Sequence, residues 1–152
     1  LIAQVMSAEL GTRIYYAAHG SFDTHTNELV NHALLWDQLS TALACFLDDL
    51  KQQGKGEETV IWMFSEFGRR IADNGAGTDH GSGGAAFVIG DSVKGGLYGE
   101  YPKLGLADQL EGDVHFNTDF RQVYATLLED VLGVESEPVL KQKFSTLDLV
   151  RS

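Results

Sequence analysis

Three short polar clusters contain the side chains of this sequence that are best suited to chemistry. The first holds Asp23 and His25, the second holds Glu66, and the third holds Asp79 and His80. Each cluster lies beside a stretch that we predict to be a buried strand; the first two follow their strands and the third precedes one. Carboxylates and imidazoles gathered at strand ends are typical of sites that bind a metal ion or a phosphate-like ligand.

The elements that must position these clusters can be predicted along the first half of the chain. Residues 1–10 predict the end of a helix, and residues 12–18 (TRIYYAA) predict a strand because they are rich in aromatic and β-branched side chains. Residues 28–53 predict a long helix, since apolar side chains recur there every three or four positions. Residues 59–64 (TVIWMF) form a continuous apolar run of strand length. The expected buried stripe of the helix comprises Leu35, Leu39, Ala42, Leu43, Phe46 and Leu50.

A strand, a helix and a second strand in this order build a parallel pair with a right-handed crossover. We therefore expect an α/β fold with a mostly parallel sheet sandwiched by helices. In the second half, residues 68–84 predict a glycine-rich loop, residues 85–90 a third strand and residues 119–132 a helix with Thr118 as its N-cap.

The loops after the first two strands would lie at the same edge of a parallel sheet, which is where ligands bind in open α/β folds. This places Asp23, His25 and Glu66 together. Asp79 and His80 would reach the same edge if strand 85–90 runs antiparallel to strand 59–64. Oxygen and imidazole ligands together suit Zn²⁺ or Mn²⁺. The predicted metal ligands are Asp23, His25, Glu66, Asp79 and His80.

Each cluster also has an ordinary structural explanation. Asp23 is suited to an Asx-turn before the helix, and His25 to a plain loop position. Glu66 is close enough in sequence to pair with Arg69 or Arg70. The third cluster has the composition of a turn. The sequence alone leaves these alternatives open.

Composition narrows the classes of function. A length of 152 residues indicates one domain spanning 1–152. The net charge of −11, without a run of Lys or Arg, excludes the electrostatic pattern of nucleic-acid binding. It also disfavours anionic substrates unless a bound cation reverses the local field. Cys45 is the single cysteine and is expected in the core, and no stretch is long and apolar enough for membrane insertion.

The chain resembles the DUF1501 family, bacterial proteins related to the alkaline phosphatase and sulfatase superfamily. The matching segments are residues 20–25 (GSFDTH), 65–69 (SEFGR), 77–81 (GTDHG), 87–90 (FVIG), 93–96 (VKGG) and 118–121 (TDFR). The resemblance implies an alkaline-phosphatase-like α/β sandwich, of which this chain would be the C-terminal part within a longer parent protein. Many relatives carry a twin-arginine export signal, so the resemblance also implies a periplasmic or exported location.

The resemblance further implies roles for individual residues. In the superfamily, Asp and His side chains hold two divalent metals, and a Ser, Thr or Cys nucleophile follows the first strand. Asp23 with His25 resembles one metal cluster, and His80 resembles the histidine that completes it. Glu66 stands where an Asp-His pair usually begins the second cluster, with Phe67 in place of the histidine. The strand and loop that would carry the nucleophile are not found in this sequence.

Two functions follow from these expectations. The first is a metal-dependent hydrolase of small anionic phosphate or sulfate esters, incomplete in this chain. The alternative is a non-catalytic exported protein or interaction domain of the same fold, with or without one structural metal. Phe67 and the missing nucleophile favour the alternative for this chain, whereas the joined clusters favour the hydrolase for its parent.

Overall fold

The computed structural model describes residues 1–151, which form two compact units of mixed helices and small antiparallel sheets. The first unit contains residues 1–58 and 72–79, and the second contains residues 59–71 together with the chain from residue 80 onward. The α/β class predicted from the sequence is therefore correct at this level. The two units are described separately below.

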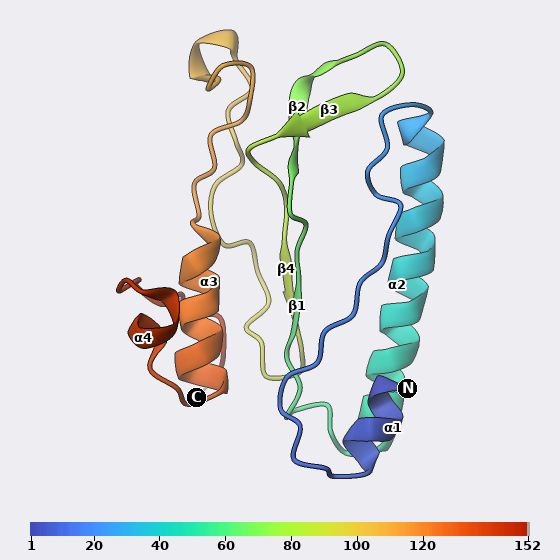
Figure 1. Ribbon diagram of the computed structural model, residues 1–152, viewed down its shortest axis with the longest axis vertical. Helices are drawn as coiled ribbons and strands as arrows, with labels where there is room; N and C mark the ends of the chain where they lie inside the picture. The colour runs from blue at the N-terminus through green and yellow to red at the C-terminus, as the bar shows by residue number, and fades with distance from the viewer. Residues whose placement is uncertain (152) are drawn as a thin grey trace. The chain divides into compact units, whose positions relative to one another are not determined.

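The first unit is built on one long helix. Helix α1 spans Ile2–Ser7 and helix α2 spans Glu28–Gln52 (Figure 1), which confirms the predicted helix 28–53 within one residue. Asn27 precedes α2 in the left-handed conformation, with φ of 50°, and its side chain makes no capping hydrogen bond. Within the predicted apolar stripe of α2, Leu50 alone is fully buried, and its carbonyl accepts a hydrogen bond from the backbone N–H of Lys55 at 2.8 Å.

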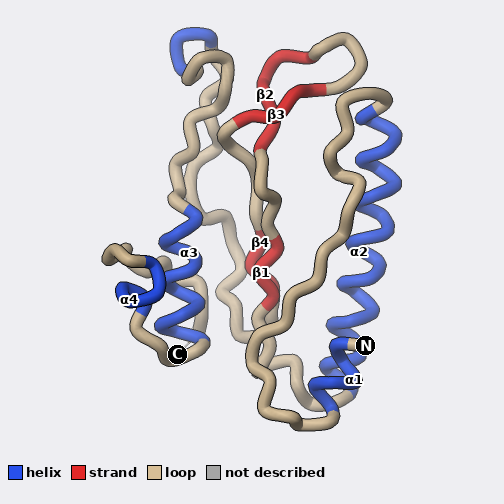
Figure 2. Tube along the Cα trace, viewed as in Figure 1, coloured by secondary structure: helices blue, strands red, loops and turns tan. Residues whose placement is uncertain are grey.

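The predicted strand at residues 12–18 is wrong. Figure 2 shows the whole connection between α1 and α2 as loop. The side chains of Ile14 and Tyr16 are 71% and 81% exposed. Aromatic and β-branched residues favour a strand only where they pack against a partner, and this segment has no ladder. The parallel pair expected from a strand–helix–strand unit is consequently not formed, and the strands that do pair form two-stranded sheets.

The predicted glycine-rich loop at residues 68–84 is also wrong, because most of it forms a β-hairpin. Strand β2 spans Gly68–Asp73 and strand β3 spans Thr78–Gly81. In the four-residue connection the backbone N–H of Asn74 donates to the carbonyl of Gly77 at 2.8 Å. An Asn-Gly pair favours such a reversal, since glycine supplies the positive φ of 96° found at Gly75. The hairpin tip, residues 72–79, belongs to the first unit and its base to the second.

The second unit contains the other sheet. Strand β1 spans Ile61–Met63 and pairs antiparallel with strand β4, Phe87–Ile89, with Trp62 opposite Val88. This confirms the prediction that strand 85–90 runs antiparallel to strand 59–64. The ring of Trp62 lies 6.2 Å from that of Tyr124, which joins the sheet to the helix that follows.

The helices of the second unit follow a short 3₁₀ turn, η1, at Leu106–Asp108. Helix α3 spans Phe120–Thr126 and continues as a π-helical turn, η2, over Leu127–Val131, which confirms the predicted helix 119–132. Helix α4, Ser136–Leu140, was not predicted.

The hydrophobic core of the second unit is small. Its buried apolar side chains are Val123, Ala125 and Leu149. The buried hydroxyl of Thr126 donates to the carbonyl of Gln122 at 2.7 Å and accepts from the N–H of Leu147 at 2.8 Å.

The base of the hairpin requires glycine for steric reasons. A Cβ atom placed on Gly68 would lie 1.9 Å from the carbonyl oxygen of Gly83, and one placed on Gly83 would lie 2.3 Å from Cγ2 of Val114. The N–H of Arg69 donates to that same Gly83 oxygen at 3.3 Å. Two backbone segments therefore touch directly at this point, with no space for a side chain between them.

Two further expectations can be compared with the structure. Cys45, expected in the core, is exposed on α2, because the cysteine lies outside the half-buried stripe of that helix. Across residues 1–151, none of the helices combines the length and apolar character that a membrane crossing requires.

Candidate functional site

Three of the five predicted ligands lie together in the first unit. His25 Nε2 is 3.0 Å from Asp23 Oδ1, and His25 Nδ1 is 3.1 Å from Asp79 Oδ1. The amide nitrogen of Asn74 donates to the same Asp79 oxygen at 3.1 Å. We call these four residues, Asp23, His25, Asn74 and Asp79, the His25 cluster.

The imidazole of the His25 cluster has a carboxylate at each ring nitrogen. Carboxylates accept hydrogen bonds, whereas a neutral imidazole has one N–H donor and one lone pair. Both contacts are therefore hydrogen bonds only when His25 carries two protons. In the neutral ring, one lone pair would face a negatively charged oxygen, and a metal cation at that position would bind both atoms. A proton and a metal cation would therefore occupy the same position, between a ring nitrogen of His25 and the carboxylate oxygen beside it.

The loop that holds Asp23 and His25 is anchored by an aromatic side chain between α1 and α2. The ring of Phe22 makes edge-on contacts with His19, His32 and Trp36, at centroid distances of 5.5, 5.7 and 5.6 Å. Two of these rings belong to α2, so Phe22 fixes the loop against the helix. The N–H of Thr24 donates to the carbonyl of Phe22 at 2.8 Å, which closes a tight turn centred on Asp23.

The hairpin tip brings Asp79 to this loop. Asn74 donates to the backbone carbonyl of His25 at 3.4 Å as well as to Asp79. Its side-chain oxygen accepts from the N–H groups of Ala76 and Gly77 at 3.0 and 2.9 Å. Asn74 therefore both closes the turn and joins the tip to the loop. The sequence prediction missed Asn74, although the Asn74-Gly75 pair is a strong hairpin signal.

The cluster lies at the surface. The side chains of Asp23, His25 and Asp79 are 66%, 43% and 60% exposed. Exposed ion pairs contribute about 0–1 kcal/mol to stability. Stability of the fold therefore gives little reason to gather three ionisable side chains from two distant segments at this point.

A shallow hollow opens beside the cluster. It has a volume of about 260 Å³, and one of the residues that line it is Thr24, between Asp23 and His25 in the sequence. Its lining combines polar and aliphatic side chains: Ser21, Thr24, Asn31, Leu34, Leu35 and Gln38. The hollow offers space for a small organic group.

The remaining predicted ligands, Glu66 and His80, belong to the second unit. Glu66 is exposed in the turn before β2, and Arg70 pairs with Asp113 at 3.5 Å rather than with Glu66. The His80 ring stacks on Phe67, with centroids 3.8 Å apart and planes within 10°. Phe67, which by the family resemblance stands in place of a usual histidine, is therefore in direct contact with the predicted ligand His80.

A second carboxylate–cation arrangement lies at the start of α3. Asp119 is the N-cap of that helix, in place of the predicted Thr118, and accepts the N–H of Arg121 at 2.9 Å. The Arg121 guanidinium donates to both carboxylate oxygens, at 2.9 Å from Nε and 2.6 Å from Nη2. The side-chain hydrogen bond from Arg121 is the main cause that lowers the pKa of Asp119; partial burial opposes it, and the backbone hydrogen bond adds to it. The same side-chain pairing raises the pKa of Arg121.

A family model, described as a protein of unknown function (DUF1501), matches residues 1–142. The chain belongs to the DUF1501 family. The matched span includes the whole His25 cluster and the hollow beside it. None of the curated proteins and none of the solved structures matches the DUF1501 chain.

Proposed function

We propose that this DUF1501 chain provides a divalent-metal site for the hydrolysis of phosphate or sulfate esters, with Zn²⁺ or Mn²⁺ as the ion. The observation that supports the proposal is the convergence of Asp23, His25 and Asp79 within hydrogen-bonding distance. The family resemblance adds His80 and Glu66 as further ligands. It also adds an alkaline-phosphatase-like fold completed by other parts of a longer protein, and a periplasmic or exported location.

The donor set fits such an ion. A neutral His25 would bind the ion through one ring nitrogen together with the carboxylate beside that nitrogen, while the other carboxylate accepts the remaining ring N–H. Nitrogen and oxygen donors together suit Zn²⁺ and Mn²⁺. Without a cation, neighbouring carboxylates repel one another. Asn74 is not needed as a ligand, since its amide already orients Asp79 by a hydrogen bond of 3.1 Å. Such outer partners hold metal ligands in place and tune their basicity.

The residues of the cluster have separable roles in this proposal. Asp23 and Asp79 fix the plane of the His25 ring between them, and Asn74 fixes Asp79. The hollow that Thr24 helps to line would receive the organic part of the ester. When bound, a divalent ion polarises an ester oxygen and stabilises the charge of the transition state. Such a cation is needed because the chain has a net charge of −11 and would otherwise repel an anionic substrate.

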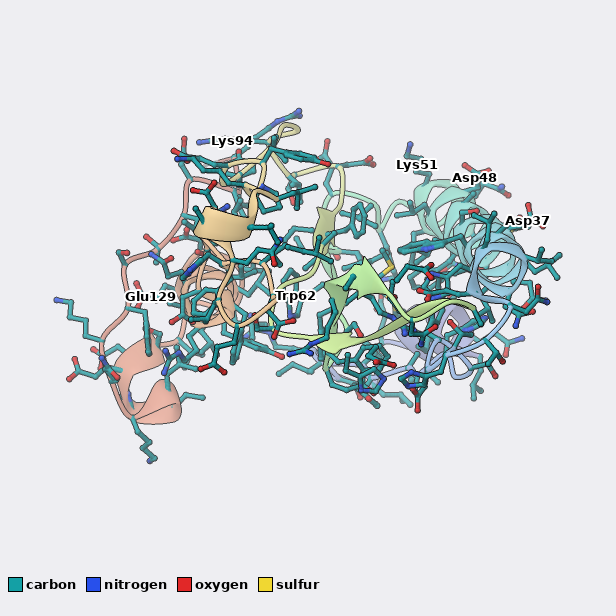
Figure 3. The ribbon with its side chains drawn as sticks, turned by 90° about the horizontal axis from the view of Figure 1, so that it is seen from above. Asp37, Asp48, Lys51, Trp62, Lys94 and Glu129 are labelled. Carbon is teal, nitrogen blue, oxygen red and sulfur yellow. The ribbon has the colours of Figure 1, made fainter. Side chains whose placement is uncertain are left out.

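Calorimetric titration of the chelator-treated chain with ZnCl₂ or MnCl₂ tests the metal site. We expect saturable binding that His25→Ala and Asp79→Asn each weaken by about tenfold or more. Two matched control variants, His115→Ala and Asp37→Asn, alter exposed residues outside the cluster, and Asp37 is seen on α2 in Figure 3. We expect these controls to bind the ion as tightly as the unmodified chain. Equal binding by all four variants would contradict the proposal that the His25 cluster binds the ion.

The hydrolase part of the proposal has its own test. Inorganic phosphate and sulfate should bind the metal-loaded chain and not the chelated one, because a bound cation would provide the positive charge that these anions need. Turnover of p-nitrophenyl phosphate should be slow with this chain alone, since no nucleophile loop was identified in its sequence. Rapid turnover that His80→Ala abolishes would contradict the idea of an incomplete site.

A second function is favoured by the stacking of His80 on Phe67. In this alternative the chain is a non-catalytic protein or interaction domain of the same fold, with or without one structural metal. An aromatic ring at the expected second metal position leaves at most one ion, whereas the superfamily reaction uses two. Metal binding without any metal-dependent binding of phosphate or sulfate would favour this alternative.

A further inference from the structure

Glu28, the first residue of α2, makes an unusual set of contacts for a helix terminus. Its side chain is only 14% exposed. Glu28 Oε2 accepts the backbone N–H of Thr78 at 2.5 Å, and both carboxylate oxygens accept the Thr78 hydroxyl, at 2.9 and 3.1 Å. A carboxylate in the first turn commonly serves its own helix. Glu28 does lie 3.7 Å from His32 Nε2 on α2, but its hydrogen bonds go to a residue 50 positions further along the chain.

The contacts of Glu28 continue along the hairpin tip. The backbone N–H of Glu28 donates to the carbonyl of Ala76 at 3.4 Å. Gly77 packs so closely that a Cβ atom there would lie 2.7 Å from Glu28 Oε2 and 3.2 Å from the carbonyl oxygen of His25. Residues 76–78 therefore pack directly against Glu28 at the start of α2. Glu28 itself is only three residues after His25 in the sequence.

The contacts between Glu28 and Thr78 restrict the position of Asp79. Thr78 is the first residue of β3 and Asp79 is the second, so a fixed Thr78 backbone leaves Asp79 few positions. Asn74 holds the other end of the turn through its own bonds to Asp79 and to the His25 carbonyl. Asp79 is therefore held by two residues. Asn74 bonds its carboxylate directly, and Glu28, which is part of α2, fixes the residue before it.

We propose that Glu28 is the positioning residue of the His25 cluster and sets its affinity for a metal ion; the affinity part rests on the metal site proposed above. In this proposal Glu28 is not a ligand of the ion. It acts through Thr78, whose position brings the Asp79 carboxylate to His25 Nδ1. Exchange of such an outer partner changes metal affinity by about 10- to 100-fold.

Calorimetry with ZnCl₂ on three variants tests the role of Glu28. Glu28→Ala removes both carboxylate oxygens that accept from Thr78 and should raise the Kd about tenfold or more. Glu28→Gln keeps one side-chain oxygen for the Thr78 N–H and should restore most of the affinity. Thr78→Val removes only the hydroxyl and should have an effect between these two. The matched control, Glu57→Gln, changes an exposed glutamate and should leave the Kd unchanged.

A measurement without metal separates positioning from general stability. The ring ¹⁵N chemical shifts of His25 report on its two carboxylate contacts, and the chelator-treated protein is used for this measurement. In Glu28→Ala the Nδ1 signal should change, because Asp79 loses its position, and the Nε2 signal should change with it, because the two nitrogens share one tautomer equilibrium. In the control Glu57→Gln both signals should stay. If Glu28→Ala does not fold, Thr78→Val provides the same comparison.

The outcomes distinguish the two proposals. A Kd and an Nδ1 signal that remain unchanged in Glu28→Ala and Thr78→Val would overturn the positioning role. An unmodified chain that binds no Zn²⁺ while the Nδ1 signal still responds to these variants would overturn the metal site and its affinity, and would retain Glu28 as the residue that positions Asp79.

Discussion

The His25 cluster and the Asp119–Arg121 pair use similar side chains in opposite ways. Asp119 and Arg121 are two residues apart, and their bonds complete the start of α3. Asp23 and His25 instead meet Asp79, which is 54 positions further along the chain from His25. The helix cap satisfies a backbone donor that would otherwise lack a partner. The cluster satisfies no backbone donor through its carboxylate–imidazole contacts.

The difference shows how a functional arrangement can be separated from a structural one. A local pair of carboxylate and cation has a sufficient explanation in helix capping. A pair assembled from distant and exposed segments has to be held by other groups, and here Phe22, Asn74 and Glu28 hold it. This supporting framework, more than the ionisable residues themselves, makes the His25 cluster the better candidate for binding.

The largest effect that separates the two regions should be the response to metal. A ligand that binds only the folded state at about 100 times its Kd stabilises it by about 2.7 kcal/mol. We expect the melting temperature to rise with ZnCl₂ and fall with chelator, and His25→Ala to abolish most of the response. Asp119→Asn should respond like the unmodified chain. The response should weaken in acid, since protons compete with the ion for its ligands. A full response in His25→Ala would erase the distinction between the regions.

Gly77→Ala should disturb the cluster through the backbone that supports it. The new methyl group would lie 2.7 Å from Glu28 Oε2 and 2.9 Å from Glu28 Cβ. Overpacking of this kind costs about 1–3 kcal/mol, and denaturant unfolding measures it. Gly20→Ala is the control, because nothing lies within 4 Å of its added atom and its φ is ordinary. Similar losses in both variants would show that close packing at the hairpin tip is unimportant.

Asp119→Ala should lower stability by about 1 kcal/mol, the usual effect of removing an N-cap. Because Arg121 lowers the pKa of Asp119 in the folded state, the stabilisation is complete above the ordinary aspartate pKa of 3.8 and is lost as the pH falls through the lower folded value. The difference in unfolding free energy between the variant and the unmodified chain should therefore shrink in strong acid. A constant difference across this pH range would mean that packing, rather than charge, accounts for the loss.

Asp148→Asn should have the smallest effect. The Asp148 carboxylate pairs with Lys94, which Figure 3 labels, but its side chain is 83% exposed. Such surface pairs contribute about 0–1 kcal/mol, and the hydrogen bond from the Tyr98 hydroxyl to the Asp148 backbone carbonyl, at 2.8 Å, remains in the variant. A loss as large as that of Asp119→Ala would show that distant surface pairs stabilise this chain as well as a helix cap does.

Strong periodicity made the long helices predictable. The regular apolar spacing of α2 gave both of its ends within one residue. The apolar runs gave the positions of β1 and β4, and their antiparallel orientation was predicted from the need to bring Asp79 and His80 to the sheet edge. The strand at residues 12–18 was wrong because a strand requires a partner that composition does not reveal. Helix α4 was missed because it has only five residues, one of them Pro138.

The candidate site was partly predictable. Asp23, His25 and Asp79 were found from their residue types and from their place beside expected strands, although one of those strands does not exist. Glu28 and Asn74 were missed, since their importance depends on contacts with Thr78 and Asp79 that only the folded hairpin creates. Glutamate in a first helical turn and asparagine before glycine are common features, so sequence alone gives neither a specific role.

The contact between Gly68 and Gly83 has a consequence for how this sequence can change over time. With the Gly83 carbonyl oxygen 1.9 Å from the place of a Cβ atom on Gly68, any point mutation at codon 68 that changes the amino acid places atoms inside another backbone. A second mutation at codon 83 cannot relieve the clash, because the obstructing atoms belong to the main chain. In a library with both codons randomised, selection for folded protein will return glycine at both positions. Substitution at the base of the hairpin is therefore blocked by the backbone itself, which changes elsewhere in the sequence do not remove.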